Sequence, residues 1–512
     1  MRSRLQVIAL GIFSLLLYVF LSQISKEFNW GEGYLNRPII SYLAIYFSLT
    51  LLFYATCSTI LKQTEDRFTF WTIIILGLLF RVSILPAQQI QEDDVYRYLW
   101  DGKVFANKIN PYKYSPSEVH EFKELRIQQP EIYYKIYDEK NEHELEKLSD
   151  LKWENPKSLK YLERVNHPEV PTIYPPMAQY VFTLVHLIQP DSIFAMRIAF
   201  LIFDLLTLYF IIGILDKLRL NRNLSVIYFW CPLIIKETFN STHLDIIGIS
   251  FLCGSMYFLI CHRHSLATFF LALGFLGKLY PAILFPLYLQ SFFENSRKKE
   301  VNPWLTLFLN SVLFIVVIIL GYTPFIGIGL EIFEGLKAYS LYWQSNDSIF
   351  ACLVFLFKKL LGDFSSVTFL SNSLPIFLSK LTIVCILIGV LIWLLLKNTS
   401  LIEEPQKLLK HFFILIALVF LLSPIQNPWY LCWVVPFLCL FPSRSWMLLT
   451  GLIGLYYIDF YFDYQEIQSW TKWTPWFEYL PFYLLLIWDL CNKNNVLRKE
   501  KKIDPNAASF HL

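Results

Sequence analysis

The sequence predicts an all-α protein that crosses a membrane many times. Hydrophobic residues make up 55% of the 512 residues and aromatic residues 18%, which exceeds the balance of a soluble domain. The apolar residues gather in segments of membrane-spanning length, and the basic residues gather on alternate connections between those segments. The net charge of +3 is too small to indicate a nucleic-acid partner.

Apolar segments that could cross, or nearly cross, a hydrocarbon core of about 30 Å recur along the whole chain. They are residues 6–22, 39–61, 70–88, 192–214, 224–239, 244–261, 265–277, 279–292, 304–323, 375–396, 409–423, 430–442, 445–460 and 478–491. Two further segments, 176–189 and 350–361, are expected to be re-entrant or interfacial, because counting either as a crossing reverses the charge bias of the following loops. The pattern therefore predicts a bundle of about 12–14 transmembrane helices.

Basic stretches indicate the orientation of this bundle. They are residues 1–4, 216–223, 262–264, 296–300 and 497–502. In the predicted topology all of them fall on one side, which the positive-inside rule makes cytoplasmic. The motif-rich loops then lie on the non-cytoplasmic face. The first apolar segment lacks a small-residue cleavage site, so we expect a retained anchor.

The same pattern divides the chain into four parts. Residues 1–88 supply N-terminal transmembrane helices, 89–191 a large external catalytic loop, 192–492 a helical bundle with external substrate loops, and 493–512 a basic cytoplasmic tail. Within the external loop, residues 117–165 are rich in Glu and Lys, which favours solvated helices over a charged binding surface.

Adjacent carboxylates just beyond an apolar span are the most informative motif. Asp93 and Asp94 lie at the membrane edge, where ionisable groups invite a functional explanation. A carboxylate there could take the proton of a sugar hydroxyl as it attacks an activated carbon. Successive helical residues point about 100° apart, so the two acids cannot share one role equally. Helix capping is the competing interpretation, and paired acids could also hold a divalent cation.

The motifs EDDVYRYLWDG, NPY, TIYPPMAQ and FDLLTLYF follow one another in this region. Their order resembles the first catalytic loop of GT-C glycosyltransferases, especially the polyprenol-phosphate-mannose-dependent mannosyltransferases, including bacterial members. The likeness covers most of residues 89–290. It implies a helical bundle in a bacterial inner membrane, with a non-cytoplasmic catalytic cavity and a lipid-linked sugar donor. The chain departs from the family in lacking a strict DxD spacing, in a second span before the loop, and in its long insert.

The resemblance also assigns roles to individual residues. It implies that Asp93 or Asp94 is the catalytic base, without deciding between them. The residues that it places at the substrate are Tyr96, Asp101, Tyr112 and Tyr174.

Several basic side chains are candidates for contacts with the donor. Lys278, followed by Tyr280 at the outer end of a span, could neutralise the donor phosphate, with snorkelling as the alternative. Arg97 could bind phosphate, but pairing with Asp94 three residues away is slightly favoured. His243 is expected to contact sugar hydroxyls, because a helix cap does not require an imidazole.

The remaining candidates are polar and aromatic residues of the external segments. Prolines around His167 should bring it to the acids. Trp343, Asn346, Gln426 and Tyr430 could line a sugar site, while an interfacial aromatic belt is the alternative for the aromatic ones. By contrast Asp204, well inside a span, should find a polar partner in the bundle and be structural.

The leading functional hypothesis is a membrane hexosyltransferase. It would move a hexose, with mannose expected, from a polyprenyl-phosphate sugar to a glycan, glycolipid or protein acceptor, with inversion and with no firmly implied cofactor. A transporter or lipid flippase is the first alternative, and it predicts functional acids near the membrane midplane. A non-catalytic scaffold is the second, with the charged insert as its docking surface.

Overall fold

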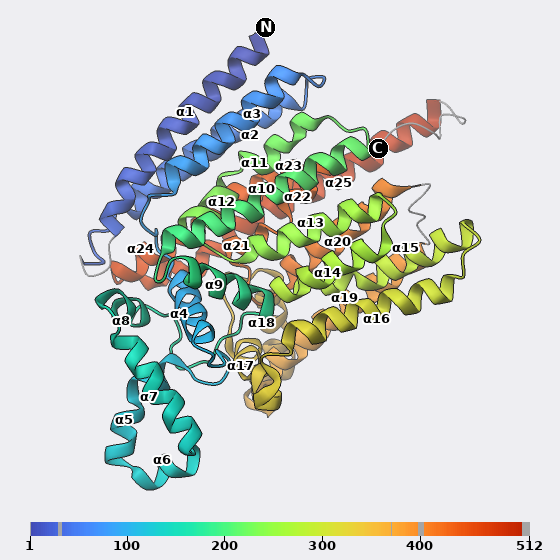
Figure 1. Cartoon of the computed structure of the whole chain (residues 1–512). Coiled ribbons are helices and arrows are strands. Elements are labelled where there is room, and N and C mark those ends of the chain that lie inside the picture. The colour runs from blue at the N-terminus through green and yellow to red at the C-terminus, as the bar shows by residue number, and fades with distance from the viewer. Residues whose placement is uncertain (1, 29–32, 370, 398–403, 504–512) are drawn as a thin grey trace.

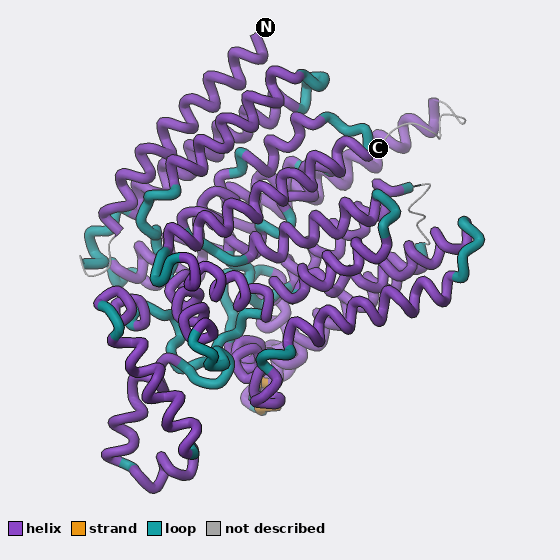
Figure 2. The backbone as a smooth tube through the Cα atoms, in the orientation of Figure 1, coloured by secondary structure: helices purple, strands orange, loops and turns teal. Residues whose placement is uncertain are grey.

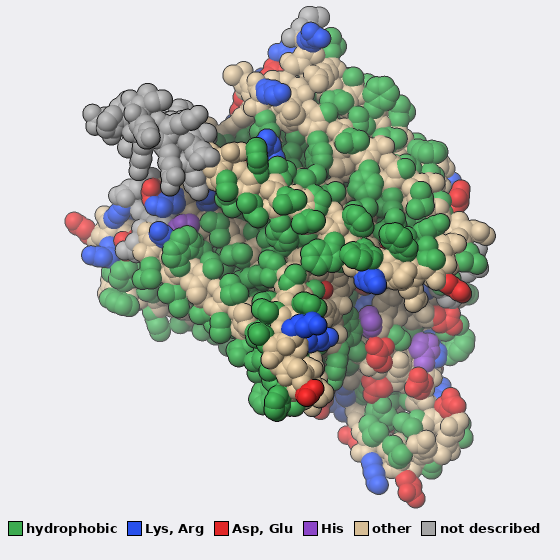
Figure 3. Space-filling view, turned by 180° about the vertical axis from the view of Figure 1, so that it is seen from behind, with side chains coloured by type: hydrophobic (Ala, Val, Ile, Leu, Met, Phe, Trp, Pro, Cys, Tyr) green, Lys and Arg blue, Asp and Glu red, His purple; other side chains and the backbone are tan. Residues whose placement is uncertain are grey.

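The computed structural model describes residues 2–28, 33–369, 371–397 and 404–503, and within this part it is helical almost throughout (Figures 1 and 2). The one sheet in the described residues is the two-residue pair of β1 (Thr368–Phe369) and β2 (Asn372–Ser373). Apolar side chains gather over the outer face of the bundle, whereas acidic side chains gather on the part that projects from it (Figure 3).

Within the residues that the structure describes, seven helices are long and apolar enough to cross a membrane. They are α1 (Arg2–Ile24, continued by η1, Ser25–Phe28), α2 (Ile39–Ile60), α3 (Arg67–Ile84), α10 (Ile193–Lys217), α16 (Pro303–Tyr322), α19 (Leu374–Leu396) and α20 (Pro405–Leu422). Each follows from an uninterrupted apolar run of the sequence. The chain is therefore a helical multi-pass membrane protein, as its composition predicts.

The predicted span 478–491 lies within the long helix α25 (Thr474–Ile503), and the other remaining predicted spans are shorter or broken. In the described part of the chain, seven helices are thus long and apolar enough where the sequence predicts about 12–14. The unbroken short ones are α13 (Asp245–Ile260) and α14 (His264–Gly277), while the segment 350–361, predicted to be re-entrant or interfacial, forms the short helix α18 (Ile349–Leu361). The broken ones are η2 (Arg222–Ser225), α11 (Val226–Phe229), α12 (Pro232–Ile235), η3 (Lys236–Asn240), η4 (Tyr280–Leu284), α15 (Phe285–Lys298), α21 (Pro428–Leu431), α22 (Val435–Leu440), α23 (Arg444–Leu452), η7 (Ile453–Tyr457) and α24 (Ile458–Tyr464). Proline interrupts several of these, because it lacks the N–H that continues a helix.

Further helices complete the chain. Those between α3 and α10 are α4 (Asp94–Ala106), α5 (Pro116–Gln128), α6 (Pro130–Ile136), α7 (Glu139–Trp153), α8 (Pro156–Leu162) and α9 (Pro176–Ile188). Those that follow are η5 (Ile326–Phe333), α17 (Glu334–Tyr342), η6 (Gly362–Ser366) and η8 (Gln468–Trp473), and α25 (Thr474–Ile503) is the last helix. Helices α5 to α7 project away from the bundle, while α4 and α9 lie against its lower end (Figure 1).

A buried lysine fastens this projection to the bundle. Lys103 of α4 donates to Glu154 Oε2 at 2.6 Å, to Ser158 Oγ at 2.5 Å and to Asp191 Oδ2 at 3.1 Å. Its side chain is 1% exposed, so these contacts satisfy an otherwise costly buried charge. They hold the start of α8 and the end of α9 against α4.

A second buried ion pair lies inside the bundle. The Arg81 guanidinium contacts both carboxylate oxygens of Asp204, at 2.6 and 3.1 Å, and both side chains are fully buried. The Tyr228 hydroxyl donates to the same carboxylate at 2.7 Å. The prediction that Asp204 finds a polar partner within the bundle is confirmed.

Candidate active site

Asn240, the last residue of η3, connects the segment before Asp93 and Asp94 to the turn that follows η3. The Asn240 side chain accepts from the Ile90 N–H at 3.1 Å and donates to the Gln88 carbonyl at 2.6 Å. The Arg197 guanidinium in turn donates to the Asn240 carbonyl at 2.8 Å. These contacts hold the segment before α4 against the turn that carries His243, so that the start of α4 faces that histidine.

The two acids have different partners, as their angular separation on a helix predicts. Asp93 is the N-cap residue of α4 but makes no side-chain capping bond, and its carboxylate lies 2.5 Å from Arg164 Nη2. Asp94, the first residue of α4, places Oδ2 3.6 Å from His243 Nδ1 and 3.5 Å from the Tyr174 hydroxyl. A quarter of the Asp94 side chain is exposed, so a substrate can reach this carboxylate.

The electrostatic surroundings shift the two acids in opposite directions. Burial raises the pKa of Asp93, and the Arg164 guanidinium offsets only part of this shift. Burial also raises the pKa of Asp94, but the facing His243 and the cation of Lys278 outweigh it, so the pKa of Asp94 lies below its ordinary value. Asp94 is therefore ionised at neutral pH and available as a base.

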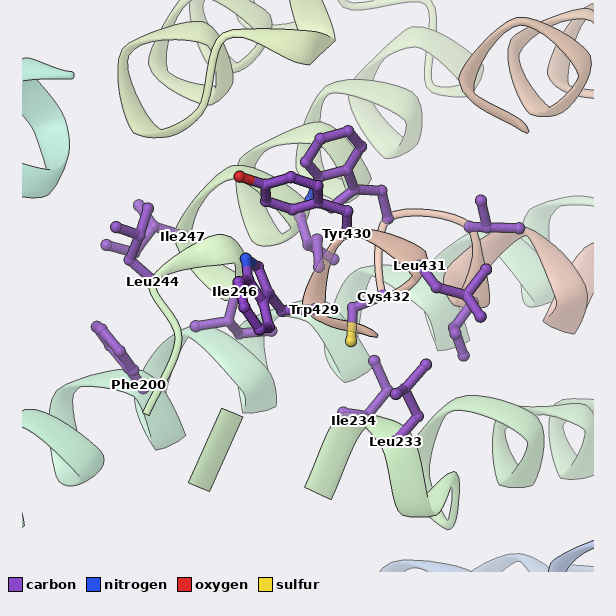
Figure 4. Close-up of a cluster of buried hydrophobic side chains, with 14 of the residues drawn as sticks. Phe200, Leu233, Ile234, Leu244, Ile246, Ile247, Trp429, Tyr430, Leu431 and Cys432 are labelled. Carbon is purple, nitrogen blue, oxygen red and sulfur yellow. The ribbon is translucent and has the colours of Figure 1, made fainter. Parts of the chain in front are cut away.

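His243 is held on three sides. Its ring stacks on the indole of Trp429 at 3.9 Å between centroids, with 18° between the planes. Nδ1 faces Asp94, and Nε2 lies 3.4 Å from Oε2 of Glu237, a buried carboxylate. The backbone N–H of His243 donates to the Glu237 carbonyl at 2.8 Å, which closes the turn. Figure 4 shows Trp429 and Tyr430, at the start of α21, among buried side chains of α12 and α13.

Lys278 directly follows α14 and lies close enough to Asp94 to lower the pKa of that carboxyl. Its Nζ is 3.3 Å from each carboxylate oxygen of Asp245 and 4.8 Å from the ring centroid of Tyr430. The side chain is 18% exposed, so the ammonium is only partly desolvated. A Cβ at Gly248 would lie 2.9 Å from Cβ of Lys278, so a glycine is required for this close approach of α13. Lys278 can thus serve an anionic ligand in addition to Asp245.

Aromatic residues form the wall next to Lys278. Tyr280 stacks on Trp433 at 4.1 Å between centroids, and the Trp433 indole N–H donates to Asp245 at 2.7 Å. The hydroxyl of Tyr430 lies 2.5 Å from that of Tyr339. The ring of Trp343, which follows α17, contacts that of His167 edge-on at 4.5 Å between centroids. His167 lies in the segment between α8 and α9. Residues from distant parts of the chain therefore enclose the site.

Arg97 does not pair with the Asp94 carboxylate, which corrects the expectation from their spacing. Its guanidinium donates instead to the backbone carbonyls of His167, at 2.9 Å, and Asn166, at 3.4 Å. The carbonyls of a folded-back loop compete successfully for a guanidinium that a neighbouring acid on the same helix would otherwise take. Arg97 thereby fixes the segment that places His167 and Tyr174.

Three residues that the resemblance places at the substrate lie in the scaffold around the acids. Burial raises the pKa of Asp101 to about 6, and its carboxylate accepts from the Gln179 amide at 3.1 Å. The Tyr112 hydroxyl donates to the Tyr174 carbonyl at 2.6 Å. The ring of Tyr96 lies 4.2 Å below the guanidinium carbon of Arg164. Their polar groups position Tyr174 and the acids.

Gln426 and Asn346 are also engaged within the protein. The fully buried Gln426 amide donates to the carbonyls of Leu421 and Ser423, at 2.9 and 3.0 Å, and accepts from Ser348 at 3.0 Å. The Asn346 amide donates to Glu478 at 2.7 Å. These two amides bind the segment after α17 to α20 and α25.

Sequence reasoning did not include Glu237, Arg164, Trp433 and Tyr339 among the site residues. Glu237 gave a usable signal, because a Lys-Glu pair interrupts an apolar run at positions 236 and 237. Arg164 gave none, because it ends a segment with many other charges. Among the described residues, no three His, Cys, Asp or Glu side chains are grouped to hold a metal ion. The divalent cation that paired acids could bind stays a prediction.

Comparisons of the chain with protein-family models, with curated proteins and with solved structures found no match. The fold defines a helical multi-pass membrane protein. The site combines an accessible carboxylate, an imidazole, a partly exposed ammonium and an aromatic wall. Such a set can accept a proton at one atom and stabilise negative charge at another.

Proposed function

We propose that this protein is a membrane hexosyltransferase. It transfers a hexose, with mannose as the expected sugar, from a polyprenyl-phosphate donor to a glycan, glycolipid or protein acceptor, and it acts on the non-cytoplasmic face of a bacterial inner membrane. The observation that carries the proposal is the placement of Asp94 and Lys278 in one site. A neighbouring base and cation suit a displacement in which the acceptor hydroxyl loses a proton and the donor sugar loses a phosphate.

The chemistry assigned to these residues is a single displacement. The acceptor hydroxyl oxygen attacks the anomeric carbon, the bond from that carbon to the phosphate oxygen breaks, and the hydroxyl proton passes to Asp94. The electron pair of the broken bond leaves with the phosphate, whose added negative charge Lys278 stabilises. One displacement from the opposite face inverts the anomeric carbon. Tyr280, Tyr430 and the rings around them exclude water from the phosphate side.

The donor can be tested directly. Purified protein in lipid nanodiscs is incubated with labelled polyprenyl-phosphate-mannose, and separately with labelled GDP-mannose, together with a membrane extract as the acceptor source. We expect consumption of the polyprenyl donor and a labelled product. Consumption of GDP-mannose alone, or movement of intact donor across liposome membranes without its consumption, would refute the proposal and favour a cytosolic sugar site or a flippase.

The mechanism also requires a particular orientation, with the external loop opposite the basic connections. In a variant without the native cysteines, single cysteines at Glu124 of α5 and at Lys62 after α2 are treated with a membrane-impermeant thiol reagent. We expect labelling of the first position in intact cells and of the second only after permeabilisation. The reverse pattern would place the site on the cytoplasmic side.

Replacing Lys278 by Met tests the assignment of the ammonium. The change keeps an apolar stem but removes a charge-assisted contact with the leaving phosphate, and we expect a loss of about 10²-fold in kcat/KM for the donor. The matched control is Lys337→Met on α17, an exposed lysine. Unchanged donor kinetics in Lys278→Met, at normal protein levels, would mean that the ammonium only snorkels.

A further inference from the structure

Behind Asp94 lies a buried set of charges that the proposed displacement does not use. His243 is 1% exposed and stands between two carboxylates, with Asp94 Oδ2 3.6 Å from Nδ1 and Glu237 Oε2 3.4 Å from Nε2. Within the described part of the chain neither ring nitrogen has a hydrogen-bond partner, and neither does Glu237 Oε2. Catalytic hydrogen bonds are often long before substrate binds and shorten in the complex. The imidazole is therefore placed to bond to both acids.

The other charges near the histidine already have partners. Glu237 Oε1 accepts from the Tyr457 hydroxyl at 2.8 Å and lies 3.8 Å from Nζ of the buried Lys236. Asp245 has Lys278, and Asp93 has Arg164. Glu92 faces Lys236 from the segment before α4, and burial raises its pKa, which favours the neutral carboxyl. Asp94 is thus the acid of this group whose nearest basic side chain is the imidazole of His243.

We propose that Glu237 and His243 act as a positioning pair for Asp94. The buried Glu237 carboxylate holds the ring at its Nε2 side, and the Nδ1 side in turn keeps Asp94 ionised and turned toward the exposed side of the site. Trp429 holds the ring plane by stacking, so that the two nitrogens point at the two carboxylates. The inference rests on the proposed function only in naming Asp94 as the base.

The consequence for the reaction is a base that stays competent at acidic pH. His243 opposes the effect of burial on the pKa of Asp94, and a facing charge or hydrogen-bond donor of this kind lowers the pKa of a carboxyl by about 1–3. Without the His243 ring, the pKa of Asp94 should rise by that amount, because burial would no longer be opposed on this side. A larger share of Asp94 would then be protonated, and unable to accept a proton, as the pH falls below neutral.

The decisive measurement is the pH profile of kcat/KM for His243→Gln. We expect its acidic limb to lie about 1–3 pH units above that of the wild type. His243→Lys supplies a positive charge and should return the limb toward the wild-type position. The matched control is His264→Gln, which alters another stacked histidine, on Phe292, and should leave the limb unchanged. A His243→Gln limb that coincides with the wild-type limb would overturn the inference.

Glu237 is tested without relying on turnover. The ring nitrogens of His243 are followed by NMR of isotope-labelled histidine in nanodiscs, with the signals identified by their loss in His243→Gln. In Glu237→Gln the Nε2 signal should move, because the carboxylate that faces this nitrogen is gone. Tyr457→Phe removes only a hydrogen bond to the same carboxylate and should move the signal less. An unchanged Nε2 signal in Glu237→Gln would remove Glu237 from the pair.

The two failures are distinguishable. If the wild type does not consume the polyprenyl donor, the proposed function is wrong, whatever the NMR of His243 shows. If the wild type consumes the donor and Asp94→Asn does not, while the acidic limb of His243→Gln coincides with that of the wild type, the function stands and the positioning pair is wrong.

Discussion

Replacing Asp94 by Asn is expected to lower the turnover of the polyprenyl donor by about 10²–10⁴-fold, the usual contribution of a general base. The amide keeps the size of the side chain but cannot accept the acceptor proton. The Asp94 side chain is partly exposed at the start of α4 and the substitution keeps its size, so membrane insertion and the melting temperature should be close to those of the wild type. Initial rates under saturating donor, with the protein amount matched by quantitative blotting, provide the measurement.

Asp93→Asn is the matched control for this experiment. The Asp93 carboxylate is occupied by Arg164 and has a raised pKa, so we expect a much smaller loss of turnover than for Asp94→Asn. Full activity in Asp94→Asn, or a larger loss in Asp93→Asn, would move the base assignment to Asp93 or away from both acids.

The second large effect is on stability. Asp204→Ala leaves the fully buried Arg81 guanidinium without its carboxylate partner, and breaking a buried pair in this way costs about 3–5 kcal/mol. We expect a strong fall in the amount of monodisperse protein and in its apparent melting temperature in detergent. Asp489→Ala is the control, because its partner Arg444 is 73% exposed and such pairs contribute about 0–1 kcal/mol. The Arg81 guanidinium also donates to the carbonyls of Gly77, at 3.0 Å, and Phe229, at 2.7 Å, and equal melting of the two variants would show that these contacts suffice.

The long helices of this fold could be predicted from the sequence because their cause is local. An uninterrupted apolar run must satisfy its own backbone hydrogen bonds in lipid, and a helix does so. The partner of Asp204 could be anticipated for the same reason, although its identity as Arg81 could not. The breaks around Pro232 and Pro428 lead to short helices that the apolar runs alone do not show, since the freed backbone groups find partners elsewhere in the bundle.

The site was predictable in its residue types rather than in its contacts. His243, Lys278 and the acids were found because charged groups are rare beside membrane spans. Whether Arg97 takes a neighbouring acid or a distant carbonyl depends on a loop that folds back from residue 166, and no local pattern encodes this. The buried amide of Gln426 has an equally non-local explanation, because its partners come from backbone turns.

The π-helical turn η3 sets a constraint on chain length. Such a turn accommodates one residue more than an α-helical turn, and η3 ends at Asn240, three residues before His243. Deleting one residue there would restore the α-helical register and rotate the following residues by about 100°, turning the imidazole away from α4. Natural variants should therefore carry no insertions or deletions in residues 236–242. Insertions and deletions should instead accumulate in the projecting helices α5 to α7, whose tip contacts nothing in the site.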